Sequence, residues 1–100
     1  MIILSRREGE AIYIETPTGR LSVRVVQVDK SKNVALLNLE TSWTGNVRSV
    51  ELRPGDEVKP TSLAGLATVH FAGWERMRIK LLVDAPKQWL VHRSKTIQET

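Results

Sequence analysis

The sequence predicts an all-β protein, either a small β-barrel or a β-sandwich. Turn-forming residues recur at short intervals, and the runs between them are short and rich in Val, Ile and Leu. Many short strands at a spacing of roughly 8 to 12 residues are typical of small sandwiches and barrels. Helical patterns are confined to residues 61–67 and to the tail at 94–100, and both are too short to be stable without tertiary contacts.

Each expected strand has its own signal. Residues 2–6 form an apolar run that ends at two arginines and a Gly-Glu turn. Residues 21–28 and 67–74 begin with the period-2 alternation of half-buried strands. The runs at 33–40 and 78–86 have longer apolar stretches, which indicate more deeply buried strands.

Composition limits the class of protein. A chain of 100 residues builds one modest core, so we expect a single compact domain over 1–100. The net charge of +4 favours an anionic partner. The absence of cysteine gives no sign of disulfides or of a thiolate metal site, and no apolar stretch approaches the roughly 18 residues of a membrane span. With no signal-peptide pattern, we expect a cytoplasmic protein without membrane contact.

The chain resembles itself when it is shifted by 46 residues. Glycines coincide in turns, where a residue without Cβ has a physical reason to recur, and several neighbours match as well: Arg7 with Arg53, Gly9 with Gly55, Glu10 with Asp56, and Gly19 with Gly65. After a one-residue slip near Asn33, Leu36-Leu37 falls on Leu81-Leu82 and Arg48 on Arg93. We interpret this as a diverged tandem duplication with repeats at 1–49 and 50–100.

The two ends of the chain carry a more specific pattern. MIILSRREGEAIYI at the start and RIKLLVDAPKQWLVHR near the end resemble the carbon storage regulator family of translational repressors. In that family two five-stranded chains interlock, each with a short C-terminal helix, and each RNA site combines the first strand of one chain with the fifth strand of the other. The resemblance implies that this longer chain is a fused pseudo-dimer, a monomer rather than a homodimer.

The resemblance also implies which residues bind RNA. One site, with both halves matching the family, would contain Leu4, Ser5, Arg6, Arg7, Ala85, Pro86, Trp89, Leu90, Val91, His92 and Arg93. Main-chain groups around residues 85–90 would read the bases of a GGA motif, and Leu4 would supply an apolar contact. Arg93 is the most important of these residues, because its planar guanidinium can bond a base or a phosphate and can also stack.

The second site would be vestigial. It would pair Val50, Glu51, Leu52 and Arg53 with Glu40, Thr41, Gly45, Asn46, Val47 and Arg48. The carboxylates of Glu40 and Glu51 stand where RNA would approach, and an unpaired anion there opposes binding. We therefore expect one competent site.

Simpler interpretations exist for several of these residues. Arginines on an edge strand also discourage aggregation, so one of Arg6 and Arg7 is expected to be only a solvated strand end. Trp89 is more often a packing residue than a stacking platform, and Trp43 and Trp74 look like packing residues. A catalytic triad of Ser5, His92 and an acid lacks a nucleophile elbow and an oxyanion signature. We expect neither catalysis, nor a cofactor, nor a metal site.

The sequence thus predicts an RNA-binding post-transcriptional regulator. It would recognise GGA motifs in hairpin loops of mRNA leaders or small regulatory RNAs and repress translation. The alternative is a protein-interaction module of the same fold that antagonises or partners conventional family members. A third interpretation keeps RNA binding but treats residues 16–66 as an insertion into an ordinary subunit, two of which would still pair.

Overall fold

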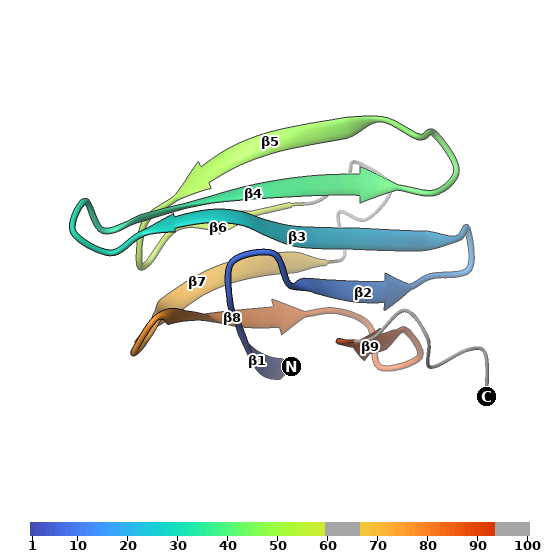
Figure 1. Cartoon of the computed structure of the whole chain (residues 1–100). Coiled ribbons are helices and arrows are strands. Elements are labelled where there is room, and N and C mark those ends of the chain that lie inside the picture. Colours follow the sequence, from blue (N-terminus) through green and yellow to red (C-terminus); the bar gives the residue numbers. More distant parts are fainter. Residues whose placement is uncertain (60–66, 94–100) are drawn as a thin grey trace.

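The computed structural model describes residues 1–59 and 67–93, and this part of the chain is all-β, as predicted. It contains nine antiparallel strands and no helix: β1 (Ile2–Arg6), β2 (Ala11–Glu15), β3 (Arg20–Asp29), β4 (Val34–Thr41), β5 (Val47–Leu52), β6 (Glu57–Val58), β7 (Thr68–Glu75), β8 (Arg78–Asp84) and β9 (Leu90–His92) (Figure 1). Both stretches with helical patterns lie outside the described residues, apart from the buried Ala67.

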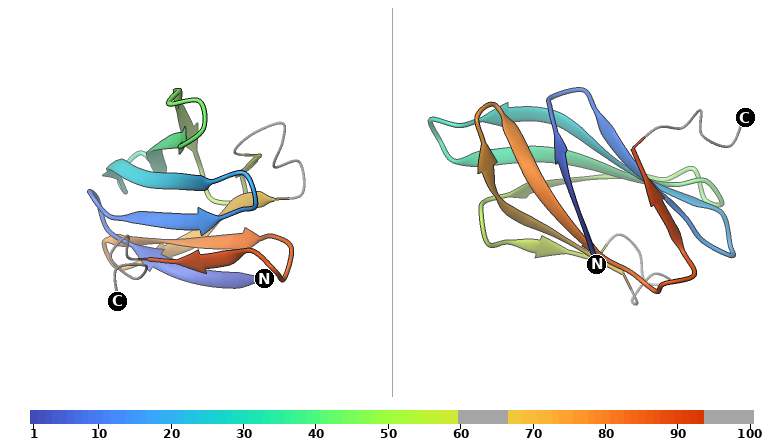
Figure 2. Two further views of the ribbon diagram at one scale, coloured as in Figure 1. Left: turned by 90° about the vertical axis from the view of Figure 1, so that its right-hand side faces the viewer. Right: turned by 90° about the horizontal axis from the view of Figure 1, so that it is seen from below.

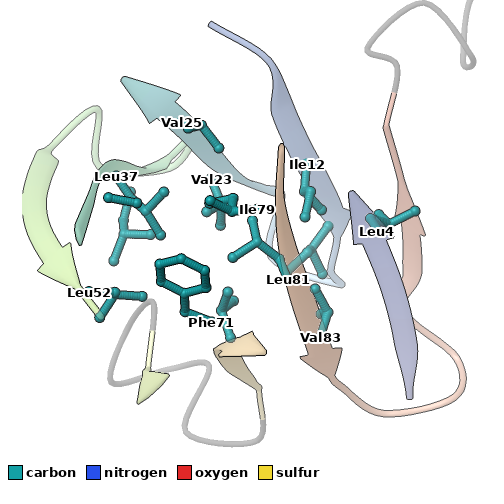
Figure 3. Close-up of a cluster of buried hydrophobic side chains, with 14 of the residues drawn as sticks. Leu4, Ile12, Val23, Val25, Leu37, Leu52, Phe71, Ile79, Leu81 and Val83 are labelled. Carbon is teal, nitrogen blue, oxygen red and sulfur yellow. The ribbon is translucent and has the colours of Figure 1, made fainter. Parts of the chain in front are cut away.

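The strands form two sheets and no closed barrel within the described ranges, which favours the sandwich over the barrel. One sheet has the order β1-β8-β7-β6, and the other has the order β5-β4-β3-β2-β9. Alternate residues of both sheets are buried in one hydrophobic core. In Figure 3 Phe71, Ile79 and Leu81 from the first sheet face Val23 and Leu37 from the second. The predicted alternation of buried and exposed residues along the strands is therefore confirmed, and the buried positions form the core.

The first strand of each half of the chain is exchanged into the other half's sheet. β1 pairs with β8 near the end of the chain, whereas β5 pairs with β4. The last strand, β9, likewise leaves its own half and pairs with β2. The four-stranded order β1-β8-β7-β6 thus has the same pattern as β5-β4-β3-β2.

The pairing registers repeat along with the order. Ala11 and Ile12 of β2 face Arg24 and Val23, and residues 46 positions later, Glu57 and Val58 of β6, face His70 and Val69. A bulge interrupts β3 between Val25 and Gln27, and its counterpart interrupts β7 between Phe71 and Gly73. The 46-residue repeat proposed from the glycines therefore coincides with the geometry of the strands.

The turn between the two central strands shifts the repeat more than predicted. Val25 pairs with Leu37, and its counterpart Phe71 pairs with Leu81, so β4 and β8 correspond at a separation of 44 residues. The one-residue slip that aligned Leu36-Leu37 with Leu81-Leu82 is wrong, because it would place buried residues of β4 on outward-facing residues of β8. Because each strand has two leucines in a row, an alignment that is wrong by one residue still matches leucine with leucine.

The first half has four strands instead of the five expected. Residues 42–46 form a turn that leads directly from β4 into β5, so no fifth strand intervenes. β5 also runs across the expected repeat boundary between residues 49 and 50. In the pairing register Arg48 faces Leu39 as Ile2 faces Val83, which makes Arg48 the counterpart of Ile2 and not of Arg93.

Equivalent turns join the first and second strands of each half, which lie in different sheets. Gly9 and Gly55 have φ of 90° and 96°, a conformation that favours glycine. The Glu10 carboxylate accepts a hydrogen bond from the Arg7 N–H at 2.8 Å, and Asp56 accepts one from the Arg53 N–H at 2.9 Å. Acidic residues after these glycines therefore stabilise turns, as predicted for Asp56.

Candidate nucleic-acid interface

The two segments that carry the sequence pattern meet at one side of the molecule. β1 and β9 are edge strands of different sheets, and they run in the same direction in the right-hand view of Figure 2. Both strands contribute to a shallow groove of about 270 Å³, whose lining consists of Met1, Ile2, Val83, Ala85, Pro86, Lys87, Trp89 and Val91. Residues from the start and the end of the chain thus share one surface.

On β1 the expected site residues divide between core and surface. Leu4 is only 5% exposed and belongs to the core, as Figure 3 shows. The neighbouring Ile3 is 60% exposed, and Ile2, which is 37% exposed, lines the groove, so both are apolar side chains that this strand offers to a ligand. Ile3 was missed in the sequence, although the period-2 alternation around Leu4 could have identified it.

The two arginines at the end of β1 have different environments. The Arg6 side chain is 12% exposed, and its Nη2 lies 3.8 Å from Glu10 Oε1. Its Nε donates to the Ser5 carbonyl at 2.8 Å. Arg7 is exposed, and among the described residues its guanidinium has no ion-pair partner. Arg7 is therefore the arginine of this pair that can reach a ligand.

The Glu10 carboxylate contacts both arginines at the end of β1. The hydrogen bond from the Arg7 N–H lowers the pKa of Glu10, and the positive charges of Arg6 and Arg7 lower it further. An ionised Glu10 keeps the Arg7 backbone fixed, while the Arg7 side chain stays in solvent.

The segment between β8 and β9 forms the opposite wall of the groove. Ala85 and Pro86 are half-buried, and the Trp89 N–H donates to the Pro86 carbonyl at 3.0 Å to close a turn. Trp89 packs against the core, as do Trp43 and Trp74, which favours packing as the role of all three indoles. Leu90 is 53% exposed, and Val91 is half-buried.

His92 anchors β9 to the rest of the molecule. The side chain is buried, its Nε2 lies 2.9 Å from Glu15 Oε2, and its ring stacks on Tyr13 at 5.8 Å. The same Glu15 oxygen accepts a hydrogen bond from Arg20 Nε at 2.7 Å. Because this ionic and aromatic cluster holds β9 against β2, His92 acts on the site through the position of its strand.

Ser5 and His92 have different partners. The Ser5 hydroxyl donates to Glu75 at 3.4 Å, whereas His92 pairs with Glu15. Their hydrogen bonds therefore do not connect them in the order that a Ser-His-acid triad requires.

Arg93 lies exposed at the end of β9. Within residues 1–59 and 67–93 its guanidinium has no ion-pair partner, so its donors face solvent. A planar cation with five donors, two residues after Val91 of the groove, suits both the bases and the phosphates of a single-stranded RNA loop.

The residues of the expected second site are arranged differently. Val47, Arg48, Val50, Glu51 and Leu52 lie together on β5, while Glu40 and Thr41 belong to β4 and Gly45 and Asn46 to the turn between them. They form one hairpin, whereas the β1 side has two edge strands from different sheets.

Within residues 1–59 and 67–93 no fifth strand lies beside β5, and a side chain of β5 bonds to the backbone on this side. Arg48 Nη2 donates a hydrogen bond to the carbonyl of Lys59 at 2.9 Å. Lys59 is the counterpart of Tyr13, a residue of β2 that pairs with β9. Arg53 is exposed, and its Nη1 donates to the Lys32 carbonyl at 3.0 Å. The guanidinium groups on this side are therefore committed to backbone carbonyls.

The described residues contain no group of three or more His, Asp or Glu side chains arranged to hold a metal ion. They also contain no helix that is both long and apolar enough to span a membrane.

Comparisons of the chain with family models, with curated proteins and with solved structures find no match.

Proposed function

We propose that this protein is a post-transcriptional regulator that binds GGA-containing hairpin loops of mRNA leaders or small regulatory RNAs between β1 and β9. One observation carries the proposal. The start of the chain, at Met1 and Ile2 of β1, and the segment from Ala85 to Val91, more than 80 residues apart in the chain, line the same groove. The resemblance to the carbon storage regulator family requires this juxtaposition of a first and a fifth strand.

The exchange of strands between the halves supports the finer assignment of the fold. In a fused pseudo-dimer of two interlocked repeats, strands of one repeat should pair with strands of the other. β1 with β8 and β5 with β4 follow that rule. The repeated register favours duplication over an insertion at 16–66, because β3 and β4 match β7 and β8 pair by pair and lie in the core.

The mechanism follows from the chemistry of the groove. Unpaired bases of the loop would enter between the strands, where main-chain groups around residues 85–90 read their edges and Ile2 and Val91 of the groove supply apolar contact. Arg93 and Arg7 would bind phosphate or base oxygens from the two sides. Occupation of a leader in this way represses translation by covering the ribosome's access to it. With one site per chain, the protein cannot gain avidity by bridging two motifs.

The decisive experiment is native mass spectrometry of the chain with a short hairpin that carries GGA in its loop. We expect one chain to hold one RNA. Arg93→Ala should weaken binding roughly ten- to a hundred-fold, because a charged hydrogen bond contributes about 1.5–3 kcal/mol. Arg53→Ala removes the same charge from the opposite side, so it is the matched control and should leave the affinity nearly unchanged.

Three other outcomes would change the interpretation. Two chains with two RNAs would restore the paired-subunit interpretation. An equal loss in both variants would reduce the interaction to general charge attraction. No complex at moderate salt would refute RNA binding.

The second candidate is a protein-interaction module, and the apolar side chains on the two edge strands favour it. Ile3 and Leu90 are exposed beside open strand edges, which can accept a strand from another protein. A pull-down that captures a conventional family member in a mixed complex, together with no measurable affinity for GGA hairpins, would favour this candidate over RNA binding.

A further inference from the structure

Four cations line the outer face of the β1-β8-β7-β6 sheet, toward the end of β1 and β8 opposite the groove residues Ile2 and Val83. Arg7 follows β1, Arg76 lies in the turn between β7 and β8, and Arg78 and Lys80 lie on β8. We call these four residues the cationic strip. Arg78 and Lys80 alternate with the fully buried Ile79 and Leu81, so they project from the outer face. Lys80 faces Ser5 in the pairing register, which joins the strip to β1.

The turn end of the strip is hollowed. Arg7, Arg76 and Arg78 surround a concave site of about 540 Å³ together with Glu75 and Met77. Figure 1 shows this turn at the left end of the molecule, near the turn between β3 and β4. Lys30 Nζ donates to the Arg76 carbonyl at 2.8 Å across these two turns, which fixes the backbone of the hollow.

Carboxylates of the protein offset the charges of the strip only in part: Glu75 lines the hollow, and Glu10 lies near enough to Arg7 and Arg78 for their charges to lower its pKa. None of its four cations takes part in an ion pair among the described residues. Of the described residues, Glu75 is the acidic one that lines the hollow, and its carboxylate accepts a hydrogen bond from Ser5. Unpaired like charges at close quarters produce a positive potential that attracts an anionic ligand.

The backbone at Arg76 gives a second reason to suspect a ligand. Glu75 and Arg78 are paired, so Arg76 and Met77 form a two-residue hairpin turn. Arg76 has φ of 59°, the left-handed region, at a position where glycine or asparagine fits without strain. A long cation held at such a position, at the mouth of a basic hollow, suits a binding role.

The other half of the molecule lacks the strip. Val34 and Leu36 of β4 occupy the register positions of Arg78 and Lys80, and Glu51 of β5 occupies the position of Ser5. Two cations are replaced by apolar side chains, and a hydroxyl is replaced by a carboxylate. The strip is therefore a property of the β1 side alone, the side with the proposed RNA site.

We propose that the cationic strip binds the phosphate backbone of the RNA stem next to the loop held between β1 and β9. This inference rests on the proposed function and extends the site from loop to stem. Arginine and lysine contacts to phosphates supply affinity without reading sequence, and the paired stem presents its phosphates as a regular shape. The strip therefore selects GGA motifs that are presented on a hairpin over the same motif in an unpaired strand.

The test compares two RNAs, a GGA hairpin with a stem and a short unpaired GGA oligonucleotide. Arg78→Val combined with Lys80→Leu installs the residues that this fold already has at the equivalent positions of β4. We expect this double variant to bind the hairpin roughly tenfold more weakly than the wild type. The slope of its log affinity against log salt concentration should fall by the amount that corresponds to about one to two lost phosphate contacts. Its affinity for the unpaired oligonucleotide should stay at the wild-type value.

Lys32→Ser combined with Lys59→Ser is the matched control, since it removes two exposed charges away from the strip. The inference is overturned if the β8 variant weakens neither RNA, weakens both equally, or behaves like the control. Arg93→Ala, measured in parallel, separates the two proposals. If Arg93→Ala weakens both RNAs while the β8 variant weakens neither, the loop site stands and the stem contact is wrong. If wild-type protein binds neither RNA, the proposed function itself fails.

Discussion

β1 and β5 occupy equivalent positions in the two sheets, yet their surroundings differ. β1 lies beside β9 and an exposed arginine, whereas beside β5 the guanidinium of Arg48 is bonded to the carbonyl of Lys59. Both strands pair with a central strand in the same register. The comparison shows that the groove requires β9 and the segment before it as well as β1.

The largest effect is expected in the core, where the halves also differ. Phe71 and Val25 are counterparts, both fully buried, and Phe71 also packs edge-on against Trp74 at 5.2 Å. Phe71→Ala should cost about 3–5 kcal/mol of unfolding free energy, and Val25→Ala about 2 kcal/mol, because the larger cavity loses more contacts. Urea denaturation of both variants measures this. Equal costs would mean that the two halves share the core evenly.

The two histidines test how β9 is held. His92 is buried against Tyr13 and Glu15, whereas His70 is half-buried and 3.2 Å from the exposed Glu57. His92→Ala should destabilise the fold by about 1–3 kcal/mol and weaken RNA binding through displacement of β9. His70→Ala should cost less than about 1 kcal/mol, because exposed pairs contribute little. Thermal unfolding of the two variants would contradict this account if His70→Ala proved the more damaging.

Acid titration sharpens the comparison of the two first turns. The hydrogen bond from the Arg7 N–H keeps the pKa of Glu10 below its ordinary value of 4.5. The unfolded chain therefore binds this proton at higher pH than the folded chain, so Glu10 stabilises the fold above about pH 4.5 and the contribution is lost as the pH falls below it. Glu10→Gln should make stability less dependent on pH in this window.

The control for that titration is Glu40→Gln, since Glu40 is exposed and accepts no side-chain hydrogen bond within the described ranges. Its unfolding curve between pH 6 and pH 3 should follow that of the wild type. If Glu10→Gln also follows the wild-type curve, the Arg7–Glu10 bond contributes nothing to acid sensitivity.

The smallest expected effect is the most informative about the second side. Glu51→Ser removes the carboxylate from β5 and restores the hydroxyl that Ser5 has on β1. We expect native mass spectrometry to show still one GGA hairpin per chain, because the part of the chain that the structure describes places no fifth strand beside β5. A second bound RNA would show that charge, and not the absent strand, disables this side.

Local patterns predicted the strands well, because alternation and turn chemistry act over a few residues. The runs at 21–28 and 78–86 became β3 and β8 with small changes at their ends, and the acid after Gly55 closes its turn. The buried position of Leu4 was also available from alternation, although the resemblance directed attention to RNA contact instead.

Long-range pairing limited what could be predicted of the site. Nothing in the sequence near Arg48 reveals that it faces Leu39 and thereby corresponds to Ile2. The turn between the two central strands is longer in the first half of the chain than in the second, and this difference shifts the register of the repeat. The cluster of His92, Tyr13 and Glu15 also joins residues nearly 80 positions apart. Such contacts follow from the order of strands in the sheets, which no short stretch of sequence specifies.

The exchange of strands has a consequence for how the chain folds during synthesis. Ile2 pairs with Val83, so the first strand to be made waits for almost the whole chain before its partner exists. Contacts between residues so distant in sequence slow folding, since a long loop must close before they form. β3 and β4, by contrast, are joined by a short turn and can pair early. The groove is therefore among the last parts of the molecule to form, and an incomplete chain that ends before β8 cannot build it.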